Sequence, residues 1–286
     1  MSIEIVAQEY RKNTEHLFGD MDDTTITSCI QGYCGGVIWA DSAEQPTIVR
    51  AQLGGRIKGS GGFAFVAGNA DSELAEELLR KWDEQWQGSL IIVPQNERWC
   101  RRIEQCFGDK ASAHTRYATS KSEHHFDRAQ LESWAQSLPE PYTLHLMNAE
   151  YYNMCRESGW ALDCVANYAT AQEYEQYGMG VICMCGDKPA GVVSTYSSYD
   201  KGIEIEIDTN EAHRRKGIAR ANASRLLLEC FDRGLYPSWD AANGSSTRQR
   251  SVARSTKSSP RPSPPPSLTR ASGPRSPKTP AHAISL

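Results

Sequence analysis

The chain has 286 residues, 39% of them hydrophobic and 23% charged, which suits one large or two small folded units with an ordinary core. No run of about 18 apolar residues occurs, so a membrane-spanning helix is excluded. The first residues lack the basic patch and apolar segment of a signal peptide. We therefore expect a cytoplasmic protein that does not use a membrane as a partner.

Nine cysteines are scattered along the chain, and no two of them have Cys-x-x-Cys spacing. Structural zinc sites usually use that spacing, and disulfide frameworks usually contain an even number of cysteines. His124 and His125 lie beside Glu123 but lack a second pair of ligands at a suitable distance along the chain. We expect reduced thiols and no metal site.

Charge divides the chain into an acidic body and a basic tail. Residues 247–286 hold eight Lys and Arg and no acidic residue, which leaves 23 basic and 35 acidic residues in 1–246, a net charge of −12. The tail is rich in Pro and Ser and has no aromatic residue, so we predict that 247–286 is disordered. A basic tail suggests nucleic acid as a partner. The acidic body and the absence of aromatic residues from the tail argue against it.

In residues 1–138, strands alternate with helices, which is typical of an α/β domain. Strands are expected at 62–68 and 89–93, and helices at 71–86, 97–107 and 127–138. Trp82 and Trp86 follow three leucines on one face of the first helix, and we interpret that face as part of a core. We assign no chemistry to this smaller N-terminal domain.

Pro139-Glu140-Pro141 interrupts the helical pattern, so we place a domain boundary between residues 138 and 139. The second domain, 139–246, is expected to hold a mixed set of elements. Strands are predicted at 143–147, 180–185, 190–196, 202–209 and 237–241, and helices at 149–158, 170–177 and 218–233.

The strand predicted at 202–209 alternates strictly between apolar and acidic residues. Ile203, Ile205 and Ile207 share one face of the sheet, while Glu204 and Glu206 share the other. The two carboxylates are candidates for acid–base chemistry. The alternative is that they form the solvent face of an edge strand.

A basic loop with one glycine, Arg214-Arg215-Lys216-Gly217, joins this strand to the helix predicted at 218–233. A helix N-terminus presents unpaired N–H groups and a positive dipole end, and Gly217 lets an anion approach the backbone closely. The pattern therefore predicts a cradle for a phosphate or pyrophosphate group. Its spacing is neither that of a Walker A loop nor that of a dinucleotide-binding loop. The alternative is a solvated turn.

Arg214-x-x-Gly217-x-Ala219 resembles the acyl-CoA signature of the GCN5-related N-acetyltransferase (GNAT) superfamily. Together with 204–219, the segment 239–246 looks like the subgroup that includes the zwittermicin-resistance-type acetyltransferases. The resemblance covers about residues 141–246. It implies an α/β (α+β) fold with a GNAT-type mixed sheet flanked by helices.

The resemblance also implies a donor, acetyl-CoA, and the residues that hold it. Strands 203–209 and 237–241 would splay apart, and the pantetheine arm would lie between them. The implied donor-binding residues are Ile207, Thr209, Arg214, Arg215, Lys216, Gly217, Ile218, Ala219 and Asn243. For Asn243, a helix cap that needs no ligand is the alternative.

The implied reaction transfers an acetyl group to an amine of a small molecule. The amine must lose a proton to attack, so a carboxylate close to it is useful as a base. We assign that role to Glu206, with Glu204 in reserve.

After Ser246 the sequence departs from the family, which would continue with an apolar helix and two more strands. Our hypothesis is that the C-terminus is frame-shifted or otherwise replaced. The sheet would then be incomplete at its C-terminal end, and the usual general acid would be missing. The alternative function is therefore a GNAT-like module that binds acyl-CoA without catalysing transfer.

Overall fold

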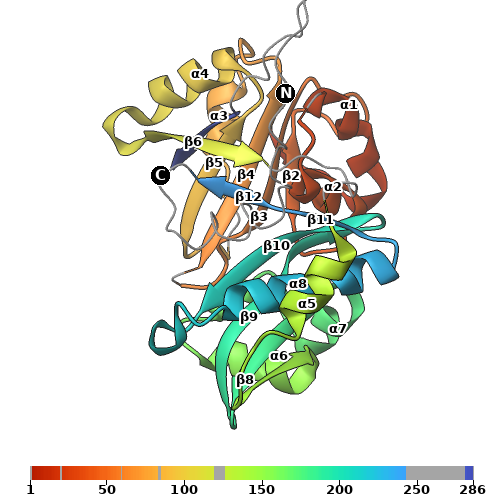
Figure 1. Ribbon diagram of the computed structural model, residues 1–286. Helices are drawn as coiled ribbons and strands as arrows, with labels where there is room; N and C mark the ends of the chain where they lie inside the picture. The colour runs from red at the N-terminus through yellow and green to blue at the C-terminus, as the bar shows by residue number, and fades with distance from the viewer. Residues whose placement is uncertain are drawn as a thin grey trace, which may run out of the picture.

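The computed structural model describes residues 2–19, 21–58, 60–82, 85–118, 126–242 and 281–285. Two mixed sheets lie one above the other, and helices cover the faces of each (Figure 1). The first has the strand order β1-β2-β3-β4-β5-β13-β6-β12, and the second β11-β10-β9-β8-β7. The predicted α/β fold class, with a mixed sheet flanked by helices, is confirmed. No helix in the described ranges is long and apolar enough to cross a bilayer.

The first sheet is sandwiched between two groups of helices. Its strands are β1 (Glu4–Ile5), β2 (Val37–Ala40), β3 (Ile48–Gly54), β4 (Gly61–Gly68), β5 (Ser89–Pro94), β6 (Ser112–Ala118), β12 (Asp240–Ala242) and β13 (Ala281–Ser285). One face packs on α2 (Thr24–Gln31), which follows η1 (Gln8–Thr14) and α1 (Glu15–Phe18). The other face packs on α3 (Ala75–Leu79) and α4 (Glu97–Phe107). Both faces are therefore buried.

The second sheet is covered in the same way. Its strands are β7 (Tyr142–Leu146), β8 (Gly180–Cys185), β9 (Lys188–Tyr199), β10 (Gly202–Thr209) and β11 (Tyr236–Ser238). One face lies under α5 (Arg128–Ala135) and α8 (Ile218–Asp232), with the three isoleucines of β10 packed beneath them. The other face holds α6 (Ala149–Glu157), η4 (Leu162–Cys164) and α7 (Ala171–Tyr177). Although α5 precedes the predicted boundary at 138, it packs on α8.

The two sheets repeat one pattern of connections. In each, two α-helices and a short 3-10 helix follow the first strand. The next three strands then extend the sheet, each antiparallel to the strand before it. A helix, α3 or α8, then leads to a fifth strand that runs parallel to the fourth. Thus β1 to β5 correspond in topology to β7 to β11. The chain contains two units of the same layout, which we call the N-terminal unit (2–118) and the C-terminal unit (126–238).

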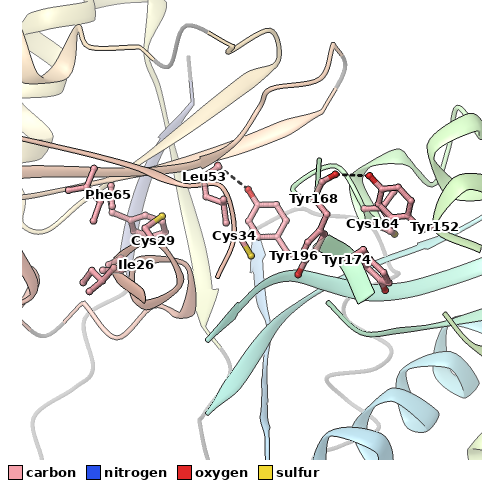
Figure 2. Packing of buried hydrophobic residues seen from close by; sticks show 14 of the residues in the cluster. Ile26, Cys29, Cys34, Leu53, Phe65, Tyr152, Cys164, Tyr168, Tyr174 and Tyr196 are labelled. Carbon is pink, nitrogen blue, oxygen red and sulfur yellow. Dashed lines mark hydrogen bonds between the residues drawn. The ribbon is translucent and has the colours of Figure 1, made fainter. Parts of the chain in front are cut away.

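One hydrophobic cluster joins the two units. Figure 2 shows Phe65 and Leu53 of the N-terminal sheet in the same cluster as Tyr168, Tyr174 and Tyr196 of the C-terminal unit. At the edge of this cluster, the hydroxyl of Thr25 lies 3.2 Å from that of Ser197. Because the buried surface is shared, the units pack as one body.

Several predicted elements have different limits in the structure. The helix expected at 71–86 is much shorter, since α3 spans only Ala75–Leu79. Trp82 is 36% exposed and stacks on Trp86 beyond the helix, so the proposed core face does not continue through both tryptophans. The strand expected at 237–241 divides at Trp239 into β11 and β12, which belong to different sheets.

The tail also differs from its prediction where it is described. Residues 281–285 form β13, which pairs antiparallel with β5 and β6. The expectation of disorder is therefore wrong for these five residues, because open backbone groups of two neighbouring strands give them partners. Residues 243–280 lie outside the described ranges, and Asn243 is among them.

A buried arginine fixes the end of α3 in the N-terminal unit. Arg50 is fully buried, and its guanidinium donates to the carbonyl oxygens of Leu79 at 2.8 Å and Lys81 at 2.5 Å. It also donates to Gln52 Oε1 and lies over the ring of Trp82. Burial lowers the pKa of Arg50 to about 9. These bonds supply the helix-terminal carbonyls with donors that water cannot provide here.

We predict that Arg50→Met lowers the free energy of unfolding by about 3 kcal/mol, because several buried acceptors lose their donor. Urea unfolding monitored by tryptophan fluorescence measures this. The control is Arg98→Met, which removes only an exposed ion pair with Asp71 and should cost at most about 1 kcal/mol. Equal losses in the two variants would contradict a structural role for Arg50.

Candidate active site

A gap opens between β10 and β11 because the two strands pair only at their beginnings. Gly202, Ile203 and Glu204 lie opposite Tyr236, Pro237 and Ser238. The chain then leaves the sheet as β12, which pairs with β6 of the N-terminal unit. Beyond Glu204, no described strand adjoins this edge of β10. The splay expected from the sequence is therefore present, although β12 makes it by joining the other sheet.

The backbone of β10 directs polar groups into this gap. Tyr236 donates its N–H to the carbonyl of Lys201, and Asn210 donates to the carbonyl of Ala190 on the opposite side. Because backbone groups alternate in direction along a strand, the odd-numbered residues of β10 point toward the β11 side. The N–H groups of Ile207 and Thr209 therefore face the gap.

Neighbouring carboxylates contact these two donors. The Ile207 N–H lies 3.3 Å from Glu206 Oε1, and the Thr209 N–H lies 2.5 Å from Asp208 Oδ1. In addition, the buried hydroxyl of Thr209 has no hydrogen-bond partner among the residues that the structure describes. A buried polar atom without a partner is costly, and a polar ligand in the gap would supply one. These groups fit the amide-bearing arm of an acyl-CoA.

The basic loop curls into a concave backbone turn at the start of α8. Gly217, the residue that caps the helix, has φ +84°, and Arg215 has φ +63°. No side chain caps the helix, and its first turn holds no acidic residue. Left-handed residues of this kind turn successive N–H groups toward one point, where the dipole of a 15-residue helix adds positive potential. The geometry is that of an anion cradle.

The cations of the loop are held against its rim. Arg214 Nε donates to the carbonyl of Thr209 at 3.4 Å. Lys216 Nζ donates to the hydroxyl of Tyr142 at 3.0 Å, and that hydroxyl lies 3.0 Å from His213 Nδ1. Both basic side chains are exposed, so they can reorient toward a phosphate. These contacts hold positive charge at the mouth of the cradle.

The other predicted donor-binding residues divide between backbone and core roles. The side chain of Ile218 is 1% exposed and packs in a small cluster with Ala190 and Cys183, so only its N–H fits an anion. Ala219 packs against the hydrophobic cluster beneath α8. Asn243 falls outside the described residues. The loop, the gap and the two N–H groups of β10 are adjacent in the fold.

Three carboxylates line the face of β10 that lies away from α8. Glu204, Glu206 and Asp208 alternate with the buried isoleucines and are half-buried. Glu204 lies beside the paired part of the strand, whereas Glu206 lies where the gap opens. The Glu206 carboxylate is therefore placed at the gap edge, next to the N–H of Ile207.

The surroundings of Glu206 contain further ionisable groups. Asp163 of η4 accepts the N–H of Gly61 at 3.3 Å. Burial raises the pKa of Asp163, and the charge of Asp208 raises it further. The neighbouring thiol of Cys164 has its pKa raised well above the usual value, first by burial and then by Glu206. A thiol in this environment stays protonated, so Cys164 is not a nucleophile.

Asp208, Asp163 and Tyr142 lie at this site but were not predicted from the sequence to belong to it. The alternation that singled out Glu204 and Glu206 continues to Asp208 and could have included it. Asp163 lies in a three-residue turn of helix, and Tyr142 begins a strand distant in the chain. Only the fold brings these two to the gap and to the cradle.

Comparison with known proteins agrees with this geometry. Residues 15–250 match the GNAT acetyltransferase family, so the chain belongs to that family. A GCN5-related N-acetyltransferase-like protein from Streptococcus suis is 30% identical, with a TM-score of 0.76, and the match covers 96% of this chain and 98% of that one.

More distant structures share the fold. A GCN5-related N-acetyltransferase from Sphaerobacter thermophilus has 10% identity and a TM-score of 0.54, over 99% of this chain and 93% of its own. One from Kribbella flavida has 14% identity and a TM-score of 0.50, over 84% and 85%. No curated protein matches the chain.

We predict that Gly217→Ala weakens acetyl-CoA binding roughly ten-fold, because a side chain at φ +84° shifts the N–H groups of the cradle. Calorimetric titration of acetyl-CoA measures this.

The matched control is Gly186→Ala, in the turn between β8 and β9. Gly186 has φ +63°, and an added Cβ there meets nothing within 4 Å. Both variants should lose about 1 kcal/mol of stability, but only Gly217→Ala should lose affinity. Unchanged binding by Gly217→Ala would exclude the cradle.

Proposed function

We propose that the protein is an N-acetyltransferase that transfers an acetyl group from acetyl-CoA to an amine of a small molecule. The observation that carries this proposal is the opening between β10 and β11, which has an anion cradle at one end and Glu206 at its edge. Membership of the GNAT acetyltransferase family supports acyl transfer in general. The resemblance of 204–219 supports the subgroup with the zwittermicin-resistance-type enzymes.

The donor would be held mainly by the backbone. The N–H groups of 215–219 would bind the pyrophosphate, with Arg214 and Lys216 adding charge from the rim. The N–H groups of Ile207 and Thr209 would bind the pantetheine arm. We also propose that Asn243 contacts acetyl-CoA. Bound in this way, acetyl-CoA supplies a thioester carbonyl for attack by the amine.

Glu206 is positioned to take the proton from the amine. Its carboxylate lies at the gap edge, 3.3 Å from the N–H of Ile207, and would be released toward the amine when the pantetheine arm takes that N–H. Glu204 lies one pleat further back, beside the paired strands, so we keep it in reserve. Proton transfer to a placed carboxylate, directly or through one water, contributes typically 10² to 10⁴-fold to a rate.

The amine would approach past further acidic groups. Asp163 and Asp208 flank Glu206 on the same side of β10. An alkyl amine is protonated at neutral pH, and negative charge along its path favours its arrival. Glu206 then removes the proton that prevents attack.

We predict that Glu206→Gln lowers kcat by about 100-fold or more while acetyl-CoA affinity changes less than about two-fold. The wild type and the variant are assayed by thiol release from acetyl-CoA, with ethanolamine, lysine, spermidine and glucosamine as acceptors.

Glu204→Gln is the matched control, since it removes the same charge from the same face of β10. It should retain most of the activity. Equal losses in both variants would contradict the assignment of the base to Glu206. Binding of acetyl-CoA without thiol release with any of the amines would contradict transfer itself.

A further inference from the structure

Among the described residues, the face of β10 that carries the carboxylates is the side on which an acceptor would reach Glu206. The opposite face of β10 is sealed, because Ile205 and Ile207 are buried beneath α8. The edge of the strand faces the gap that would take the donor. The remaining side is the face that carries the carboxylates. On this side the described neighbours are η4, Tyr196 and the N-terminal unit.

The N-terminal unit reaches this face through the ends of β3 and β4. Tyr196 donates its hydroxyl to the carbonyl of Leu53 at 3.4 Å, and Figure 2 shows this bond linking the two units. The N–H of Gly61 donates to Asp163 at 3.3 Å. A Cβ added to Gly54 would lie 2.7 Å from the Tyr196 hydroxyl and 2.8 Å from Asn167 Oδ1. The two units are thus in direct contact where Tyr196 and Asp163 meet Leu53–Gly54 and Gly61, and we call this contact the seam. It lies beside Glu206.

A bulge in β9 directs Tyr196 into this seam. Thr195 pairs with Ile205 and Ser197 pairs with Glu204, so Tyr196 is an extra residue with no partner in the register of β10. The amide of Asn167 donates to its carbonyl at 2.8 Å. A bulge re-aims a side chain and often occurs next to an active site. Here it turns the ring of Tyr196 toward the N-terminal unit, two residues from Ser194, the partner of Glu206 in β9.

In the N-terminal unit, the strands at the corresponding position stay paired for longer. The strands β4 and β5 pair as far as Val66 and Pro94. Beyond them, the side chain of Gln95 accepts the N–H of Gly68 at 3.1 Å, and Trp99 Nε1 donates to the carbonyl of Gly68 at 3.0 Å. Trp99 is fully buried. Two side chains therefore bond to Gly68 at the position that corresponds to the separation of β10 from β11 in the C-terminal unit.

The loop at the corresponding position is acidic, and the basic residues beside it, Arg98, Arg101 and Arg102, come from α4 instead. Residues 69–74 contain Asp71 and Glu73 in place of a basic cluster, and α3 begins with Glu76 and Glu77 in its first turn. Carboxylates at a helix N-terminus occupy the positive end that an anion would use.

We propose that the N-terminal unit, whose own corresponding strands stay paired, forms one wall of the acceptor site at Gly61, with the buried Leu53–Gly54 packed behind it. Tyr196 acts as the positioning residue that holds this wall against Glu206. The inference rests on the proposed acetyl transfer and assigns the acceptor specificity to residues of both units.

The test compares two tyrosines that each lose one hydroxyl. Tyr196→Phe removes the bond to Leu53 across the seam. Tyr152→Phe removes the 2.7 Å bond to the carbonyl of Tyr168 within the C-terminal unit, also drawn in Figure 2. Tyr196→Phe should raise KM for the most active of the four amines about five-fold, with acetyl-CoA affinity unchanged. Tyr152→Phe should leave both constants near wild type.

Equal acceptor KM values for the two variants would overturn the proposal, even if the wild type transfers acetyl groups efficiently. A wild type that releases no thiol with any amine would instead count against acetyl transfer. Hydrogen–deuterium exchange of the full chain, with CoA and each amine at millimolar concentration, gives a readout without turnover. Slower exchange at 53–62 supports the wall, and no slowing there with any of the amines overturns it.

Discussion

The early separation of β11 from β10 is the constraint on which the site depends. Parallel strands normally continue to satisfy one another, and these part after three residue pairs. The N–H groups of Ile207 and Thr209 are thereby left facing a gap, and Glu206 is placed at its edge. The cradle at the start of α8 lies at the end of the same strand. One interruption in a ladder thus exposes the two N–H groups of β10 and places Glu206 beside them.

The two units share one topology but differ at the end of the fourth strand. Both contain a fourth and a fifth strand joined by a helix. In the N-terminal unit, Gln95 and Trp99 complete the hydrogen bonds at the place where the strands would separate. In the C-terminal unit, the chain diverts into the other sheet and leaves that place open. The two units thus differ in a few side chains beyond the paired strands, and only the C-terminal unit has the site proposed for the donor.

Local patterns in the sequence predicted the elements that depend on local physics. The strict alternation at 202–209 and the helix from Ile218 were found correctly, since each carries its own periodicity. The strand β3 was missed because all seven of its residues are buried, so the strand has no alternation between a buried and an exposed face. The positions of β12, Asp163 and the Tyr196 bulge follow from partners far away in the chain. The repeat was missed as well, because a basic loop in one unit corresponds to an acidic loop in the other.

The attachment of β12 to β6 couples the width of the gap to the docking of the units. The strand that leaves β10 is anchored in the N-terminal sheet, so any shift between the units pulls on one side of the gap. A donor that enters only when the strands are apart then favours the docked arrangement, and docking favours the donor by the same free energy. On this account the pairing of β12 with β6, rather than the single bond between Tyr196 and Leu53, links the docking of the units to the proposed donor.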